Sequence, residues 1–164
     1  QEILYNQKLQ NTMDLVGVIM EKYRKYNADF IVVDKTGVGQ GVYDRLKDLG
    51  YPLRGVAFGE KSEEPMFRNL KAEWHWRERK WLLSGGRLLS DFGWNEFEIV
   101  KYKNKDGVIE IEPKEHLLSK GIASPNVVDA AVLTQVISDA IIRGNRVLQS
   151  NQFVDATDKI WRNG

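Results

Sequence analysis

The chain has 164 residues, a length typical of one domain, and its 42% hydrophobic content predicts a real core. Charged residues make up 29%, a composition that does not indicate disorder. The net charge of +1 does not indicate a nucleic-acid partner, which would have to bind a local patch. The absence of cysteine excludes disulfides, thiolate metal sites and cysteine nucleophiles. The two histidines, His75 and His116, are too far apart in sequence to suggest a histidine-rich metal site.

The N-terminal residues predict a strand that lacks a preceding partner. Apolar positions alternate in QEILYNQKLQ, so we expect the sequence to be a fragment of a longer polypeptide. No apolar run approaches the ~18 residues of a membrane span, and no signal peptide is visible. We therefore expect a protein that is neither secreted nor in a membrane.

The first half of the chain predicts a strand–helix–strand unit. A helix over 12–26 follows Asn11 as its cap, and the apolar run DFIVVD then predicts a central strand over 29–34. A short helix over 41–49 and a strand over 52–58 follow. This order predicts parallel pairing with helices on the faces of the sheet, and hence an α/β fold.

The second half predicts two long helices around a hairpin. The longest helix covers 66–83, and most of its aromatic residues are expected in the core, while 94–100 is ambiguous. Two strands within 101–112 are joined by the turn Asn104-Lys105-Asp106-Gly107. A last helix begins with Ser124 as cap and Pro125 at its first position. We expect one domain over 1–142 and a polar tail over 143–164.

Two phosphate-binding motifs and one catalytic triad are excluded. The glycines of GVGQG, 37–41, do not have the dinucleotide spacing G-x-G-x-x-G, and no P-loop is present. Neither histidine lies near a serine between a strand and a turn, so Ser/His/Asp chemistry is not indicated.

Two carboxylates remain as candidates for chemistry. Asp34 ends an apolar strand, where α/β proteins place ligands, although it could simply cap the following turn. Asp129 lies among Val127, Val128 and Ala130, so its carboxylate needs a partner. A divalent ion such as Mg²⁺ or Mn²⁺ would provide one; a lysine or the helix N-terminus is an equal alternative.

An ordered set of segments resembles the nuclease domain of the large terminase subunit of tailed bacteriophages or prophages. The set is VVDKTGVGQGVYDRL, then GVAFG, FRNLKAEWHWRERKWLLSGG and GVIEIEPKEHLLSKGIASPNVVDAAVLT, and the resemblance runs from about Asp29 to Ile137. It implies an RNase H-like fold, a central mixed β-sheet flanked by helices. It also implies metal-dependent cutting of concatemeric double-stranded viral DNA during genome packaging.

The resemblance also implies site residues. Asp34 matches the acid of the central strand, and Asp129 the acid near the start of the last helix. Asn126 stands where many relatives have an acid or a histidine, and could contact metal weakly through its amide oxygen. The family's first acid lies upstream of this sequence, and Asp14 cannot replace it because it belongs to a helix. The complete site is expected to hold two Mg²⁺ or Mn²⁺ ions; this fragment would hold an incomplete one.

Lysines are the candidate DNA contacts. Lys35 follows Asp34, and positive charge gathers around the hairpin and before Asp129. The candidate residues are Lys35, Lys101, Lys103, Lys105 and Lys120, with Lys114 nearby. They could bind the DNA backbone without reading sequence, or solvate the edge of the hairpin.

Other polar and aromatic residues are expected to be structural or exposed. Glu110 and Glu112 share a strand face and are expected to be solvated. His75 is expected on the surface of its helix, and Trp76 is the one aromatic residue there considered for base stacking.

The resemblance implies the small terminase subunit, the portal protein and double-stranded DNA as partners, an upstream ATPase domain, and the host bacterial cytoplasm as location. Two alternatives remain open: a non-catalytic DNA- or portal-docking module, and another RNase H-like nuclease such as a resolvase.

Overall fold

The computed structural model describes residues 1–7, 11–89 and 93–136 as a mixed α/β fold. The elements of its first half are α1 Thr12–Lys25, β1 Ile31–Asp34, α2 Gly39–Asp48 and β2 Leu53–Val56. Those of its second half are α3 Leu70–Leu83, α4 Glu96–Ile99, β3 Tyr102–Lys105, β4 Val108–Ile111, α5 Lys114–Ser119 and α6 Asn126–Leu133. Within these ranges the named strands form two separate pairs, β1 with β2 and β3 with β4. The polar tail predicted over 143–164, and the end of the last predicted helix, lie outside the described residues.

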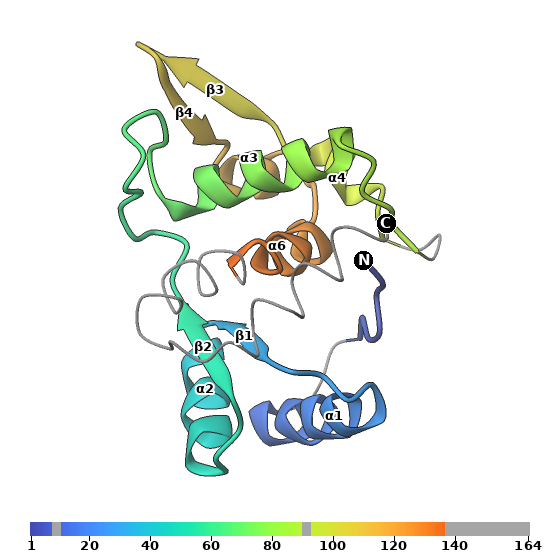
Figure 1. The fold of residues 1–164 in the computed structure, drawn as a ribbon. Coiled ribbons are helices and arrows are strands. Elements are labelled where there is room, and N and C mark those ends of the chain that lie inside the picture. The colour runs from blue at the N-terminus through green and yellow to red at the C-terminus, as the bar shows by residue number, and fades with distance from the viewer. Residues whose placement is uncertain (8–10, 90–92, 137–164) are drawn as a thin grey trace, which may run out of the picture.

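The predicted strand–helix–strand unit is confirmed. β1 and β2 are parallel, with Ile31 opposite Leu53 and Asp34 opposite Val56. In Figure 1 this pair lies between α6 on one side and α1 and α2 on the other. Asn11 caps α1 as predicted, because its side chain accepts a hydrogen bond from the backbone N–H of Asp14.

Both faces of β1 are covered by apolar side chains, which explains its continuous apolar sequence. Val33 packs with Val16 of α1 and with Val42 and Leu46 of α2. Val32 packs on the opposite face. The core on that face consists of Val56, Phe58, Trp74, Val128, Val132 and Val136. This second core ties α3 and α6 to the parallel strands and fixes the helix that carries Asp129.

The predicted hairpin is confirmed as β3 and β4, which project from α3 (Figure 1). Its turn places Asp106 at φ 53° and Gly107 at φ 83°, the left-handed conformations that a two-residue hairpin turn requires. The side chain of Asn104 accepts a hydrogen bond from the N–H of Gly107. Ile109 then packs against Phe67 and anchors the hairpin to the body.

Two predicted boundaries differ from the structure, and one ambiguous segment is assigned by it. The long helix begins at Leu70, because Asn69 caps it, rather than at 66. The predicted Ser124 cap is wrong: α6 begins at Asn126, without a hydrogen bond from a local capping side chain. The ambiguous segment before the hairpin contains the short helix α4.

The predicted N-terminal strand is also wrong for residues 1–7. Glu2 forms only an isolated bridge with Leu89, and the side chain of Gln1 instead reaches Glu78 of α3. No helix in the described ranges is both long and apolar enough to cross a membrane.

Candidate functional site

Asp34 lies at the carboxyl end of β1, on a tight turn into α2. Its Oδ1 accepts a 2.9 Å hydrogen bond from the backbone N–H of Thr36. Gly39 closes this turn, since a Cβ at that position would lie 1.8 Å from the carbonyl oxygen of Asp34. Asp34 therefore stabilises the turn, and its Oδ2 has no hydrogen-bond or ion-pair partner among the described residues.

Asp129 is buried on α6 and faces three basic side chains. The Lys71 ammonium lies 3.3 Å from Oδ1, and the Lys114 ammonium contacts Oδ2. The Nε2 atom of His75 lies 3.8 Å from Oδ1. Although these are ion-pair contacts, neither oxygen accepts a hydrogen bond of regular geometry from the described residues. The lysine-pairing alternative for Asp129 is thus present in the structure.

His75 is buried on α3, so the prediction of a surface position is wrong. Burial and the nearby Lys71 and Lys114 ammonium groups lower its pKa to about 4, against the opposing effects of its backbone hydrogen bond and of Asp129. At neutral pH the ring is therefore uncharged. Its Nδ1 lies 2.8 Å from the carbonyl oxygen of Lys71, which can only accept a hydrogen bond. Nδ1 must then carry the proton, and Nε2 presents a lone pair toward Asp129.

Three further carboxylates are buried and were not identified as such from the sequence. Glu73 accepts a hydrogen bond from Ser62, and Glu78 accepts hydrogen bonds from Gln1 and Gln135. The prediction that Glu112 is solvated is wrong. It pairs with His116 of α5 and with Lys120, the residue after that helix, whereas Glu110 is exposed as predicted.

Asp34 and Asp129 lie on elements that contact each other, β1 and α6, but they share no hydrogen-bond or ion-pair partner among the described residues. In the described part of the chain, no three histidine or acidic side chains converge closely enough to hold one metal ion. Asn126 begins α6 and lines a different space from the one that Asp129 faces.

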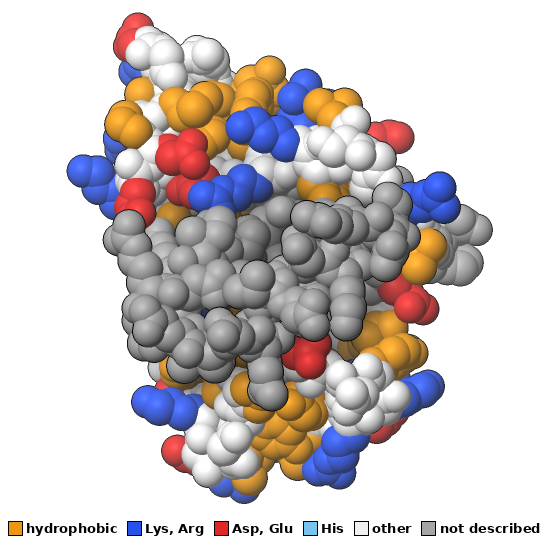
Figure 2. Space-filling view, in the orientation of Figure 1, with side chains coloured by type: hydrophobic (Ala, Val, Ile, Leu, Met, Phe, Trp, Pro, Cys, Tyr) orange, Lys and Arg blue, Asp and Glu red, His pale blue; other side chains and the backbone are white. Residues whose placement is uncertain are grey.

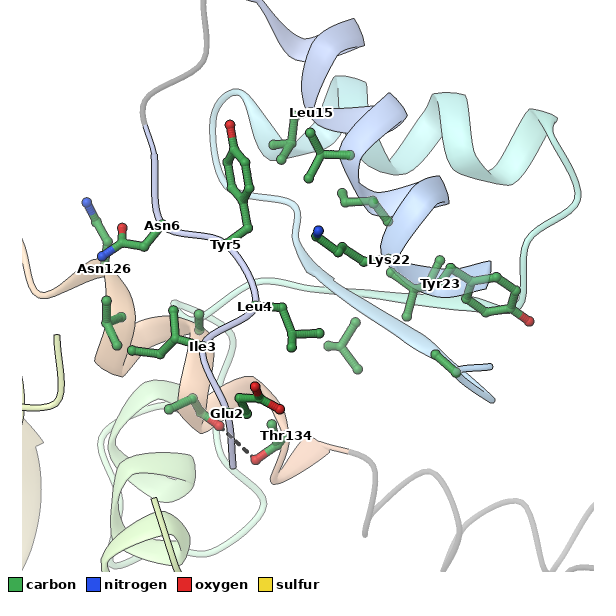
Figure 3. A pocket seen from close by; sticks show the side chains of 18 of the residues that line it. Glu2, Ile3, Leu4, Tyr5, Asn6, Leu15, Lys22, Tyr23, Asn126 and Thr134 are labelled. Carbon is green, nitrogen blue, oxygen red and sulfur yellow. Dashed lines mark hydrogen bonds between the residues drawn. The ribbon is translucent and has the colours of Figure 1, made fainter. Parts of the chain in front are cut away.

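That space is a cavity of about 980 Å³ between the N-terminal residues, α1, β1 and α6. Figure 3 shows Asn126 beside Asn6 at the α6 side, and Leu15 and Lys22 at the α1 side. Most of the lining is apolar, and neither Asp34 nor Asp129 belongs to it. This large cavity therefore lies apart from the acids that carry the candidate chemistry.

The predicted DNA-contacting lysines differ in how far they are engaged by the protein. Lys35 lies over the ring of Tyr43, Lys101 donates to the carbonyl of Glu98, and Lys120 pairs with Glu112. Lys103 and Lys105 are exposed on β3.

The register of the hairpin places Lys103 and Lys105 on one face, with Lys103 opposite Glu110. On the face shown in Figure 2, the basic side chains of the described residues lie beside acidic ones and do not form one continuous patch. A DNA contact on the hairpin would therefore be small and local.

Comparison with protein-family models, curated proteins and solved structures found no match for this chain.

Proposed function

We propose that the chain is an RNase H-like, metal-dependent DNA endonuclease domain of a phage or prophage large terminase subunit. The observation that carries the proposal is the buried carboxylate of Asp129, whose two oxygens lack regular hydrogen bonds from the described residues. In the structure the Lys71 and Lys114 ammonium groups stabilise this buried charge, and a bound metal ion would take their place. Asp34, at the carboxyl end of β1, is the second acid that the resemblance assigns to the site.

Asp34 and Asp129 supply the type of donor atom that the metal implied by the resemblance prefers. Mg²⁺ and Mn²⁺ prefer carboxylate oxygens, and Asp129 and the Oδ2 of Asp34 supply such oxygens. When bound, such ions supply an activated water and charge stabilisation for phosphodiester hydrolysis.

The chain's own residues hold the acids and attract the nucleic acid. The apolar contacts of Val128 and Val132 fix α6 and hence the position of Asp129. Lys71 and Lys114 add positive charge beside that carboxylate, where a DNA phosphate would approach. Lys103 and Lys105 provide backbone contacts on the hairpin, which would weaken with salt.

The proposal also includes the substrate, the partners and the location that the resemblance implies. Double-stranded DNA is the substrate, the small terminase subunit and the portal protein are partners, and an ATPase domain precedes this one in the intact protein. The site of action is the host bacterial cytoplasm.

A non-catalytic DNA- or portal-docking module is the second candidate. It is favoured by the pairing of Asp129 with two ammonium groups and by the engagement of Asp34 in its turn. Such a module would bind DNA or portal without cutting.

Cleavage of supercoiled plasmid in Mg²⁺, Mn²⁺ or EDTA separates these candidates. The assay compares this chain and the full-length product of its gene with Asp34→Asn and Asp129→Asn. Asp106→Asn, at the exposed hairpin turn, is the matched control. Nicking that needs metal, is lost in both site variants and survives in the control supports the nuclease. Binding without cleavage in every form, or cleavage that both site variants retain, contradicts it.

A further inference from the structure

One face of α3 combines an aromatic ring with two cations and has no role in the proposed hydrolysis. Trp76, Arg79 and Lys80 lie three and four positions apart, so they share this face of the helix. Tyr102 of β3 lies against it, with its ring centroid 5.2 Å from that of Trp76 and an interplanar angle of 82°. We call Trp76, Arg79, Lys80 and Tyr102 the aromatic–basic patch.

The patch is accessible to a ligand. Tyr102 is 52% exposed, and Arg79 and Lys80 are exposed as well. The Arg79 guanidinium lies 5.1 Å from the centroid of the Trp76 ring, a cation–π contact. Arg79 has no acidic partner among the described residues. Its charge is therefore available to an anion that approaches the two rings.

Nearby carboxylates do not neutralise the patch. The two acids of α3 are buried, where Glu73 accepts a hydrogen bond from Ser62 and Glu78 accepts one from Gln135. In the hairpin, Tyr102 is opposite Ile111, so the neighbouring Glu110 points to the other face of the strands. The patch thus has two positive charges, and neither α3 nor the strands of the hairpin add a negative one.

We propose that the aromatic–basic patch binds single-stranded DNA, with a base stacked on Tyr102 and the adjacent phosphates held by Arg79 and Lys80. This binding activity goes beyond the cleavage of double-stranded DNA, and it rests on the proposed function only for the choice of DNA over RNA. Proteins bind single strands by stacking bases on exposed aromatic rings beside cations that contact the backbone. A duplex hides the faces of its bases, whereas a single strand offers both a face and a phosphate to this patch.

Trp76 acts as a positioning residue for Tyr102. Its ring packs with Phe67, at 6.4 Å between centroids, and belongs to the cluster formed by Phe67, Ala72 and Ile109. Phe67 and Ile109 are buried and hold the hairpin on α3, so this task does not require the half-exposed ring of Tyr102. A ring that is held from one side and open on the other loses little freedom when a base stacks on it.

The test is fluorescence anisotropy of the wild-type chain with labelled oligothymidine of about ten nucleotides. An abasic oligonucleotide of the same length has the same phosphates and no bases. EDTA in the buffer prevents metal-dependent cleavage. The variants are Tyr102→Ala, Tyr102→Phe and Arg79→Gln. Tyr26→Ala is the matched control, because Tyr26 is 47% exposed, lies under the Lys25 ammonium, and follows α1, far from the hairpin in Figure 1.

We expect oligothymidine to bind more tightly than the abasic strand, and Tyr102→Ala to remove most of that difference. The loss should be roughly fivefold to hundredfold, as for one stacked base, while Tyr102→Phe retains the affinity because it keeps the ring. Arg79→Gln should lower the slope of log affinity against log salt by about 0.7, whereas Tyr102→Ala should leave that slope unchanged. Tyr26→Ala should behave as wild type.

Equal affinity for the two oligonucleotides, unchanged affinity in Tyr102→Ala, or an equal loss in Tyr26→Ala overturns the inference. Tighter binding of oligouridine than of oligothymidine overturns the assignment to DNA. The abasic comparison and Arg79→Gln leave the hairpin intact, so they decide the outcome even if Tyr102→Ala does not fold. Plasmid cleavage without base-dependent binding would remove the patch and leave the nuclease; base-dependent binding without cleavage would do the reverse.

Discussion

The carboxylate of Glu96 accepts a 2.7 Å hydrogen bond from the backbone N–H of Val127, so a residue of α4 caps the helix that carries Asp129. The same oxygen lies 3.4 Å from the backbone nitrogen of Val128, a weaker second contact. A carboxylate at this end of a helix satisfies free N–H groups and interacts favourably with the helix dipole. The cap therefore links the stability of α4 to the position of the candidate site.

Replacing Glu96 should destabilise the protein and disturb that site. We expect Glu96→Ala to lower the free energy of unfolding by roughly 1–2 kcal/mol, the usual cost of losing a helix cap. Glu98→Ala is the matched control, because Glu98 is exposed on the same helix. Urea unfolding of both variants measures the difference. Equal losses in the two variants would show that the Glu96 contact contributes nothing specific.

Glu78 should make stability depend on pH in a characteristic direction. Burial raises the pKa of Glu78 above its ordinary value, although hydrogen bonds from Gln135 and Gln1 oppose the shift. The folded state therefore holds this proton more tightly than the unfolded state. The stabilisation is complete below the ordinary glutamate pKa of about 4.5 and is lost as pH rises through the folded value.

The variant Glu78→Gln isolates this effect because its side chain cannot ionise. The melting temperature of the variant minus that of wild type should increase as the pH rises from about 4.5 to neutral. This holds whatever the difference is at any one pH. Glu98→Gln, at an exposed position, should follow wild type across the same range. Thermal unfolding monitored by circular dichroism at several pH values makes the comparison. Parallel curves for wild type and Glu78→Gln would mean that Glu78 does not couple folding to protons.

Lys103 and Lys105 should contribute to DNA affinity if the hairpin contacts the phosphate backbone. Each phosphate contact adds about 0.9 to the slope of log affinity against log salt, so Lys103→Gln with Lys105→Gln should lower that slope by roughly two. The loss should be the same for unrelated DNA sequences. Lys47→Gln is the control, because Lys47 is exposed on α2, far from the hairpin in Figure 1. Fluorescence anisotropy at several salt concentrations tests this, and an unchanged slope in the double variant would exclude the hairpin from the interface.

The features that the sequence predicted well are those with local causes. The Asn11 cap and the hairpin turn at Asp106-Gly107 depend on interactions within a few residues. The apolar run of β1 also predicted burial on both faces, because few other structures require such a run. These signals were sufficient for the strand–helix–strand unit and for the hairpin.

The features that were missed depend on partners distant in sequence. The cap of α6 comes from Glu96 on α4, not from the adjacent Ser124. His75 is polar and was predicted on the surface of α3, and nothing in the sequence indicated the burial of Glu78. Packing against α6 and the N-terminal residues buries them instead. No periodicity in α3 itself distinguishes a solvated polar residue from one buried against such a partner.

Two glycines near Asp34 allow a test of whether close backbone packing positions its carboxylate. A Cβ at Gly39 would lie 1.8 Å from the carbonyl oxygen of Asp34, so Gly39→Ala must displace the backbone there. A Cβ at Gly41, two residues later in α2, would meet no atom within 4 Å apart from its chain neighbours and the backbone of its own helix. Gly41→Ala should therefore stabilise the helix by roughly 0.5–1 kcal/mol, the usual gain of alanine over glycine in a helix.

The two alanine variants should consequently differ in sign. We expect Gly39→Ala to destabilise the protein, because relieving the clash breaks the packing of the turn against the end of β1. If Asp34 belongs to the metal site, Gly39→Ala should also reduce metal-dependent cleavage by displacing the Asp34 carboxylate, while Gly41→Ala should not. Urea unfolding and plasmid cleavage on the same preparations give both readouts. A Gly39→Ala protein as stable and active as Gly41→Ala would mean that this close approach does not position Asp34.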